Sequence, residues 1–265
     1  MGVPTYYTRL LAEPGLDRSA CAGMRLFVSG SAPLLAETFA AFRERTGHTI
    51  VERYGMSETG MLVSNPYFGG PERRIAGTVG RPLPGVGVRV VRDDGGACAA
   101  GEVGNVEVRG PNVFGGYWRM PEKTAEEFTA DGWFRTGDLG CFGGEARPDD
   151  YLTLVGRSKD LIISGGYNVY PKEVEGVIDE LPGVVESAVI GLPHPDFGEA
   201  VAAVVVGEAG AVPEETAIVS AVRERLANYK VPKRVWVVDE LPRNSMGKVQ
   251  KNLLRERYAR AFASP

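Results

Sequence analysis

Five short segments combine hydroxyl, carboxylate, lysine and glycine residues in a pattern suited to phosphate chemistry. In chain order they are Gly30-Ser31-Ala32-Pro33, Tyr54-Gly55-Met56-Ser57-Glu58, Thr136-Gly137-Asp138-Leu139, Gly156-Arg157-Ser158-Lys159-Asp160 with Ser164-Gly165-Gly166, and Pro242-Arg243-Asn244-Ser245-Met246-Gly247-Lys248. Proteins usually hold Mg²⁺ through one or two carboxylates together with the phosphates of a substrate. The residue types therefore predict a site that handles phosphates with Mg²⁺.

Other chemistries lack the residues that they need. His48 and His194 are the two histidines, and neither lies near a serine or cysteine in a recognisable nucleophile motif. Cys21, Cys98 and Cys141 are far apart in the chain and form no C-x-x-C pair. We therefore expect neither a disulfide framework nor a zinc site.

Composition points to a globular protein that acts on small molecules. The 265 residues include 30 Lys+Arg and 34 Asp+Glu, for a net charge of −4, which disfavours a protein that binds nucleic acid through its phosphates. Apolar runs such as residues 201–206 are far shorter than the ~18–20 residues of a membrane span, and the N-terminus has no secretory leader pattern. We expect a cytoplasmic location, with neither nucleic acid nor a membrane as partner.

The first two segments follow predicted strands. Residues 24–28 and 49–53 have the apolar character of strands, and residues 34–45 between them show helical spacing of Leu35, Phe39 and Phe42. A strand, a crossover helix and a second strand form a βαβ unit, whose strands are almost always parallel. Because ligands collect at the carboxyl ends of such strands, residues 29–33 and 54–59 are expected to form loops that face one crevice.

The pattern changes twice farther along the chain. Residues 77–154 contain short β-like runs separated by Gly and Pro, which predicts a small antiparallel or barrel-like unit. After Lys159, helices with apolar residues 174–181, 218–226 and 249–254 alternate with strands 184–190, 201–206 and 235–238. We therefore predict a domain of residues 1–158 and a domain of residues 159–265.

The order and spacing of the five segments resemble the acyl-adenylate-forming (AMP-binding) superfamily, which includes acyl-CoA synthetases. The resemblance covers essentially this whole chain but only the second, C-terminal half of a usual member. It implies an α/β fold, in which the remnant of a large domain, a βαβ unit plus a small β-barrel-like subdomain, precedes a small α+β lid. The family's upstream phosphate loop, rich in Ser, Thr and Gly, is not found, and no G-x-x-x-x-G-K-[ST] motif replaces it. We expect that the chain begins within a domain, that residues 1–157 have an unfinished core, and that the lid folds alone.

The resemblance also implies roles for the nucleotide-binding residues. Ser57 would contact the adenylate phosphate, and Glu58 would bind Mg²⁺. Asp138 would accept hydrogen bonds from the ribose hydroxyls, with Arg157 beside the same sugar. Gly30, Ser31, Ala32, Tyr54 and Gly55 would form the adenine site.

Further roles concern the lid and both steps of the family's reaction. Lys248 resembles the adenylation lysine, whose charge assists attack on the α-phosphate and which would lie on a mobile loop. Lys159 falls on the hinge about which the lid rotates. Ser164, Gly165 and Gly166 resemble the loop that lines the tunnel for the pantetheine arm of coenzyme A.

Arg53 distinguishes this chain from relatives that have a small residue there. A guanidinium beside the acyl site suits a second carboxylate better than a fatty chain. Several longer runs, including residues 52–58 and 242–251, resemble malonyl-CoA synthetases, so malonate is the preferred substrate. Met56 would also contact the substrate, and Arg9 is a weaker candidate for the cation at the acyl site.

The expected activity is ATP-dependent ligation of malonate to coenzyme A through an acyl-adenylate. Alternatives are a ligase for short or medium fatty acids, and a non-catalytic fragment that binds nucleotide or a separate N-terminal half. Simpler roles also exist for single residues: Arg53 in a surface ion pair, Ser57 and Glu58 at a helix N-terminus, and Asp138 in a turn. Lys248 would then belong to a solvated basic face with Lys251, Arg255, Arg257 and Arg260.

Overall fold

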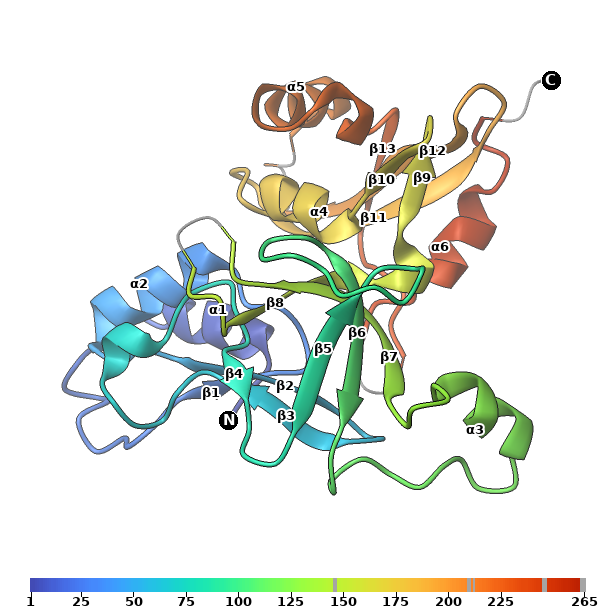
Figure 1. The fold of residues 1–265 in the computed structure, drawn as a ribbon. Helices are drawn as coiled ribbons and strands as arrows, with labels where there is room; N and C mark the ends of the chain where they lie inside the picture. Colours follow the sequence, from blue (N-terminus) through green and yellow to red (C-terminus); the bar gives the residue numbers. More distant parts are fainter. Residues whose placement is uncertain (145–146, 209–210, 212, 245–246, 263–265) are drawn as a thin grey trace. The chain divides into compact units, whose positions relative to one another are not determined.

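The computed structural model describes residues 1–144, 147–208, 211, 213–244 and 247–262 (Figure 1). The chain forms two compact units, Met1–Leu154 and Val155–Pro265. The predicted mixed α/β fold is confirmed, because both units combine sheets with helices. The functional domain border that the sequence places at Lys159 stays a prediction.

The first unit contains two sheets. Their order is β1-β2-β3-β4 in one and β5-β6-β7-β8 in the other, with the last residues of β8 passing into the second unit. The elements are α1 (Pro4–Ala12), β1 (Val28–Ser29), α2 (Ala36–Thr46), β2 (Val51–Met56), β3 (Gly60–Ser64), the 3₁₀ turn η1 (Pro71–Arg73), β4 (Arg81–Pro82), β5 (Gly87–Val91), β6 (Gly104–Arg109), α3 (Pro121–Glu127), β7 (Phe134–Phe142) and β8 (Leu152–Arg157).

The predicted βαβ unit is present. Strands β1 and β2 are parallel, with Val28 opposite Val51 and Ser29 opposite Glu52, and α2 connects them. The buried rings of Phe39 and Phe42 on α2 belong to one apolar cluster with residues of α1 and of the segment that leads into β2. This cluster holds the helices against the sheet that carries the candidate site (Figure 1).

Two predictions about this unit were wrong in detail. Residues 24–28 do not form a continuous strand, because Met24 is exposed and Phe27 packs its ring against Phe42 and His48 before pairing begins at Val28. Residues 54–59 do not form an open loop. Tyr54 and Met56 continue strand β2, and the chain then turns directly into the antiparallel strand β3.

Gly55 explains why the hairpin is so tight. A Cβ atom at this position would lie 2.1 Å from the carbonyl oxygen of Gly60, well inside any allowed contact. The register between β2 and β3 also shifts between Tyr54 and Gly55. Glycine therefore permits a close backbone approach that a loop prediction did not anticipate.

An apolar cluster joins the two sheets of the first unit. Tyr54, Leu62 and Val63 from the first sheet pack with Val106 and Phe134 from the second. In the second sheet, β6 pairs antiparallel with both β5 and β7. The predicted antiparallel unit is thus present and supports the back of strand β2.

The second unit is built around one five-stranded sheet with the order β10-β9-β12-β11, in which β13 also pairs with β12. Its elements are η2 (Ser158–Asp160), β9 (Ile162–Ser164), β10 (Tyr167–Val169), α4 (Pro171–Asp179), β11 (Val184–His194), β12 (Gly198–Gly207), α5 (Glu215–Arg225), η3 (Asn228–Lys230), β13 (Arg234–Val238) and α6 (Lys251–Tyr258).

Strand β12 is buried on both faces of this sheet. Val201, Ala203 and Val205 pack in a cluster with residues of α4 and α5, whereas Ala202 and Val204 pack in a second cluster with Leu254 of α6 and its neighbours. Successive strand residues point to opposite faces, so a continuous apolar run is what a sheet covered on both sides requires. The final helix begins at Lys251 rather than at Val249, because Val249 instead pairs with Arg243.

Candidate functional site

A hydrogen bond joins two of the predicted nucleotide-binding residues, which lie 84 positions apart. The hydroxyl of Tyr54 on β2 donates to Oδ2 of Asp138 on β7 at 2.5 Å. Both side chains are buried, at 8% and 6% exposure. The fold therefore brings the second and third motifs together at one place in the first unit.

Strand β7 is fixed to β6 just before Asp138. The hydroxyl of Thr136 donates to the carbonyl of Val106 at 2.8 Å and accepts the amide N–H of Asp138 at 3.1 Å. Gly137 between them has a φ of 70°, which favours glycine. The Thr-Gly-Asp motif is thus a local device that turns the backbone and presents the Asp138 carboxylate.

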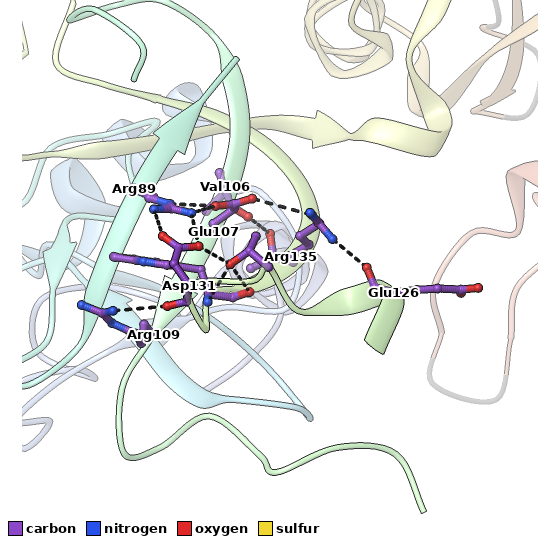
Figure 2. A network of polar contacts seen from close by, with 10 residues as sticks. Arg89, Val106, Glu107, Arg109, Glu126, Asp131 and Arg135 are labelled. Carbon is purple, nitrogen blue, oxygen red and sulfur yellow. Dashed lines mark hydrogen bonds and ion pairs between the residues drawn. The ribbon is translucent and has the colours of Figure 1, made fainter. Parts of the chain in front are cut away.

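A polar network braces the start of the same strand (Figure 2). The carboxylate of Glu107 on β6 lies within ion-pair distance of Arg89 on β5 and Arg135 on β7, while Arg89 also pairs with Asp131 at 2.7 Å. Arg135 donates to the carbonyl of Glu126 on α3. Arg89 and a neighbouring threonine lower the pKa of Asp131 to about 2. The network links β5, β6, β7 and α3 around the strand that carries Asp138.

Gly30 and Arg53 also lie together. A Cβ atom built on Gly30 would lie 3.2 Å from Cζ and 3.3 Å from Nε of Arg53. The guanidinium donates through Nη2 to the sulfur of Met1 at 3.1 Å, and its Nε is buried without a hydrogen-bond partner among the described residues. No described carboxylate forms an ion pair with Arg53, so the simple surface-pair role is not supported.

Ser29 and Glu52, which directly precede Gly30 and Arg53 in the chain, have buried polar side chains. Ser29 and Glu52 are paired across the parallel strands, at 0% and 3% exposure. The amide of Leu34 donates to Oε1 of Glu52 at 3.1 Å, while Oε2 of Glu52 and Oγ of Ser29 have no partner among the described residues. Burial raises the pKa of Glu52 to about 7, although the Leu34 hydrogen bond acts in the other direction.

The segment after β1 has an unusual backbone. Ser31 has a φ of 72°, in the left-handed region that residues other than glycine rarely adopt. Ser31 and Ala32 are both exposed, and the amide of Leu34 that follows them is held by Glu52. Strained positions of this kind persist where the surrounding structure fixes them, and they are frequent at ligand sites.

Ser57 and Glu58 occupy the turn between β2 and β3, not a helix N-terminus. The hydroxyl of Tyr117 donates to Oε1 of Glu58 at 3.1 Å, and the amide of Phe114 donates to the Glu58 carbonyl at 2.8 Å. The described residues contain no group of three or more potential metal ligands. A single half-buried carboxylate with hydrogen-bonded support suits Mg²⁺ that takes its other ligands from substrate phosphates and water.

In the second unit, Lys248 lies in a turn closed by hydrogen bonds. The Lys248 amide donates to Oδ1 of Asn244 at 2.9 Å, and its carbonyl accepts the Asn244 amide at 2.9 Å. Ser245 and Met246 of the same motif lie outside the described residues. The predicted adenylation lysine is therefore held at its backbone, immediately before α6.

The remaining predicted residues of the second unit fall on turns. Lys159 is exposed in η2, which directly follows Arg157 at the end of β8. Ser164 ends β9, and Gly165 and Gly166 form the two-residue turn to β10 with φ values of 58° and 83°. Positive φ at both positions is what a type I′ hairpin turn requires.

Two predicted substrate residues, Arg9 and Met56, form no described hydrogen bond or ion pair with the other predicted site residues. Arg9 is exposed on α1, and the described structure gives it no hydrogen bond or ion pair with another predicted site residue. Met56 packs partly buried against the cluster between the two sheets.

The sequence analysis also missed Glu52, Tyr117 and Glu175. A charged residue inside an apolar strand or helix face was the available signal for Glu52 and Glu175, while nothing in the sequence marked Tyr117.

Residues 1–118 match the AMP-binding enzyme family, and residues 173–248 match the AMP-binding enzyme C-terminal domain. The chain belongs to the AMP-binding enzyme family. The first match contains Gly30, Arg53 and Tyr54, and the second contains Lys248. Asp138 lies between the two matched ranges.

Individual members of the family are similar along nearly the whole chain. A probable CoA ligase, CCL8, from Humulus lupulus is 42% identical over 97% of this chain and 44% of its own length. The malonate–CoA ligase of Arabidopsis thaliana is 39% identical over 96% of this chain and 43% of its own length.

A solved structure of a related enzyme is also similar to this chain. ATP-bound MatB from Rhodopseudomonas palustris is 55% identical, with a TM-score of 0.92 over 99% of this chain and 51% of that chain. The chain thus spans about half the length of the family members that it matches. No helix in the described residues is both long and apolar enough to cross a membrane.

Proposed function

We propose that this chain carries the ribose-binding and lysine-bearing parts of an ATP-dependent malonate–CoA ligase. In this reaction a malonate carboxylate oxygen attacks the α-phosphate of ATP, which forms malonyl-adenylate and releases pyrophosphate. The thiol of coenzyme A then attacks the acyl carbon, gives up its proton, and releases AMP as malonyl-CoA forms. The matched family members include CoA ligases, one of them a malonate–CoA ligase.

The contact between Tyr54 and Asp138 carries the proposal for the nucleotide. A buried carboxylate next to a hydroxyl donor is suited to accept hydrogen bonds from the two hydroxyls of a ribose. Gly30, Ser31 and Ala32 would form the wall beside the adenine, and Gly55 keeps the backbone of β2 close to β3. Arg157 would assist at the same sugar.

Arg53 supports malonate as the acid. It directly precedes Tyr54 on β2, and because successive strand residues point to opposite faces, Arg53 and the contact of Tyr54 with Asp138 lie on different faces of that strand. Its guanidinium donates to the sulfur of Met1, which is a weak acceptor, and no described carboxylate neutralises it. A free guanidinium can bind the second carboxylate of malonate with two parallel hydrogen bonds, whereas a fatty chain would leave it unpaired.

The remaining residues would act on the phosphates and on coenzyme A. Glu58 would hold Mg²⁺, which when bound neutralises phosphate charge, and Ser57 would contact the adenylate phosphate. The ammonium of Lys248 would place its charge beside the attacking carboxylate and the α-phosphate. Ser164, Gly165 and Gly166 would line the path of the pantetheine arm, and Lys159 would be the hinge.

The test compares this chain alone with a chimera. In the chimera, the upstream part of MatB that this chain does not match is joined to residues 1–265. Malonate- and CoA-dependent AMP formation is measured for both proteins and for Lys248→Ala. Activity of the chimera that falls at least 100-fold in Lys248→Ala supports the proposal. A folded, nucleotide-binding chimera without AMP formation would instead support the non-catalytic alternative.

Substrate choice is tested in the same chimera. Arg53→Ala should lose malonate activity and keep or gain activity with short or medium fatty acids. Arg53→Lys is the matched control, which retains the charge but not the planar pair of donors. Equal malonate activity in all three proteins would remove Arg53 from the proposal.

A further inference from the structure

Glu175 is a buried carboxylate in the second unit that no predicted role uses. It lies on α4 at 1% exposure and accepts three donors. The ammonium of Lys251 lies 2.6 Å from Oε1, that of Lys172 lies 2.8 Å from Oε2, and the amide of Val189 on β11 donates to Oε1 at 2.9 Å. Both carboxylate oxygens are therefore engaged.

Lys251 connects this carboxylate to the turn that carries Lys248. It is the first residue of α6, three positions after Lys248, and its side chain is 14% exposed. The amide of Gln250, immediately before it, donates to the carbonyl of Pro242 at 2.8 Å, which closes the base of the turn. The contact with Glu175 thus fixes the end of the turn to α4.

The opposite side of the turn is tied to β11. Arg243 donates through Nη1 to the carbonyl of Gly247 at 2.7 Å, and its Nη2 forms an ion pair with Glu186. Glu186 and Val189 lie on the same strand, β11. Both ends of the Lys248 turn are therefore connected to β11, one through Arg243 and the other through Lys251 and Glu175. A lysine that acts on a developing charge must be held in position, since small displacements cost large factors in rate.

We propose that Glu175 is a positioning residue for Lys248, acting through Lys251. It touches no predicted substrate position itself. The ion pair fixes where α6 begins, and the closed turn then fixes the backbone of Lys248. This inference rests on the proposed function, in which Lys248 acts in adenylation.

Amide hydrogen exchange of the 265-residue chain tests the structural part without any activity. Glu175→Gln keeps an acceptor for the Val189 amide but removes the charge that holds Lys251. Lys251→Met leaves Glu175 paired with Lys172 and releases only the α6 side. Exchange at residues 247–251 should become at least about tenfold faster in both variants. The matched control is Glu173→Gln, on the same helix, which breaks an exposed pair with Lys230 and should leave this exchange unchanged.

The kinetic part uses the MatB chimera and malonate-dependent exchange of labelled pyrophosphate into ATP. Glu175→Gln and Lys251→Met should lower kcat about 10- to 100-fold, with the KM for malonate unchanged. In a Lys248→Ala background, Glu175→Gln should have no further effect, because its action passes through Lys248.

The outcomes separate the two proposals. An inactive parent chimera contradicts the proposed function, while the hydrogen-exchange result still decides whether Glu175 fixes the turn. Unchanged exchange in Lys251→Met, or full additivity of Glu175→Gln with Lys248→Ala, overturns the positioning role. If Glu175→Gln fails to fold, Lys251→Met decides alone.

Discussion

Glu52 and Glu175 are both buried carboxylates, yet the two units treat them in opposite ways. Glu52 in the first unit has one described donor, the amide of Leu34, and its Oε2 has no partner among the described residues. Glu175 in the second unit has two lysines and a backbone amide. Burial raises the pKa of Glu52 to about 7, whereas at Glu175 Lys172 and Lys251 outweigh burial and lower the pKa to about 2.

The difference separates a buried carboxylate whose two oxygens are both paired from one that keeps an oxygen without a described partner. A buried charge that is fully paired fixes the elements around it, as Glu175 does for α4, β11 and α6. Glu52 instead keeps one carboxylate oxygen without a described partner, opposite Ser29 on the neighbouring strand, and buried carboxyl groups with a perturbed pKa are frequent at functional sites. Perturbed carboxyl groups in one chain therefore need not share a role.

Removal of both lysines that pair with Glu175 should have the largest effect on stability. Lys172→Met/Lys251→Met leaves the Glu175 charge buried with one amide donor, which should lower the free energy of unfolding by about 3–5 kcal/mol. Urea unfolding of the 265-residue chain, followed by hydrogen exchange in β11 and β12, measures the loss. Adding Glu175→Gln to this double variant should restore most of the stability, because no buried charge remains.

The next largest effect should be a pH dependence of the free energy of unfolding that arises from Glu52. Its pKa is about 7 in the folded chain against 4.5 for an ordinary glutamate, so the folded state binds the proton more tightly. The resulting stability is fully present below pH 4.5 and is lost as the pH rises through 7. Between pH 5 and 8 the free energy of unfolding of the first unit should fall by on the order of 2 kcal/mol.

Glu52→Gln should remove most of this slope. Urea unfolding at several pH values, compared with the exposed Glu37→Gln as a control for the loss of one carboxylate, measures it. A slope that is the same in both variants would show that another group of the first unit titrates in this range. Asp179 of the second unit, whose pKa burial raises to about 6, contributes in the same direction there.

Sequence reasoning reached the fold and the family because their signals are local, and the site residues that it named stay predictions. The parallel βαβ unit follows from apolar runs around the helical spacing of Phe39 and Phe42, and motif order identified the family. The features that it missed depend on contacts between residues that are brought together only by the folded chain. The Gly55 hairpin exists because the backbone of Gly60 comes within a distance that only glycine allows. The Glu175 cluster joins residues 172, 189 and 251, whose meeting no spacing rule predicts.

Tyr54→Phe should have a smaller effect than either change above. It removes the hydroxyl donor to the buried Asp138 carboxylate and leaves the ring in its cluster, so the free energy of unfolding should fall by about 1–2 kcal/mol. In the chimera, the KM for ATP should rise while the KM for malonate stays constant. A matched loss of both would indicate that β2 as a whole has moved, because Arg53 lies on the same strand.

Glu173→Gln should have the smallest effect and completes the comparison within α4. Glu173 and Glu175 both accept a lysine ammonium, yet Glu173 is exposed, so water already solvates the charge that Lys230 pairs with. Such pairs contribute less than about 1 kcal/mol, and salt screens them. Chemical unfolding at low and at 1 M salt should therefore differ little between Glu173→Gln and the parent chain. A cost equal to that of Glu175→Gln would mean that burial does not set the value of these ion pairs, and the contrast between the two carboxylates would fail.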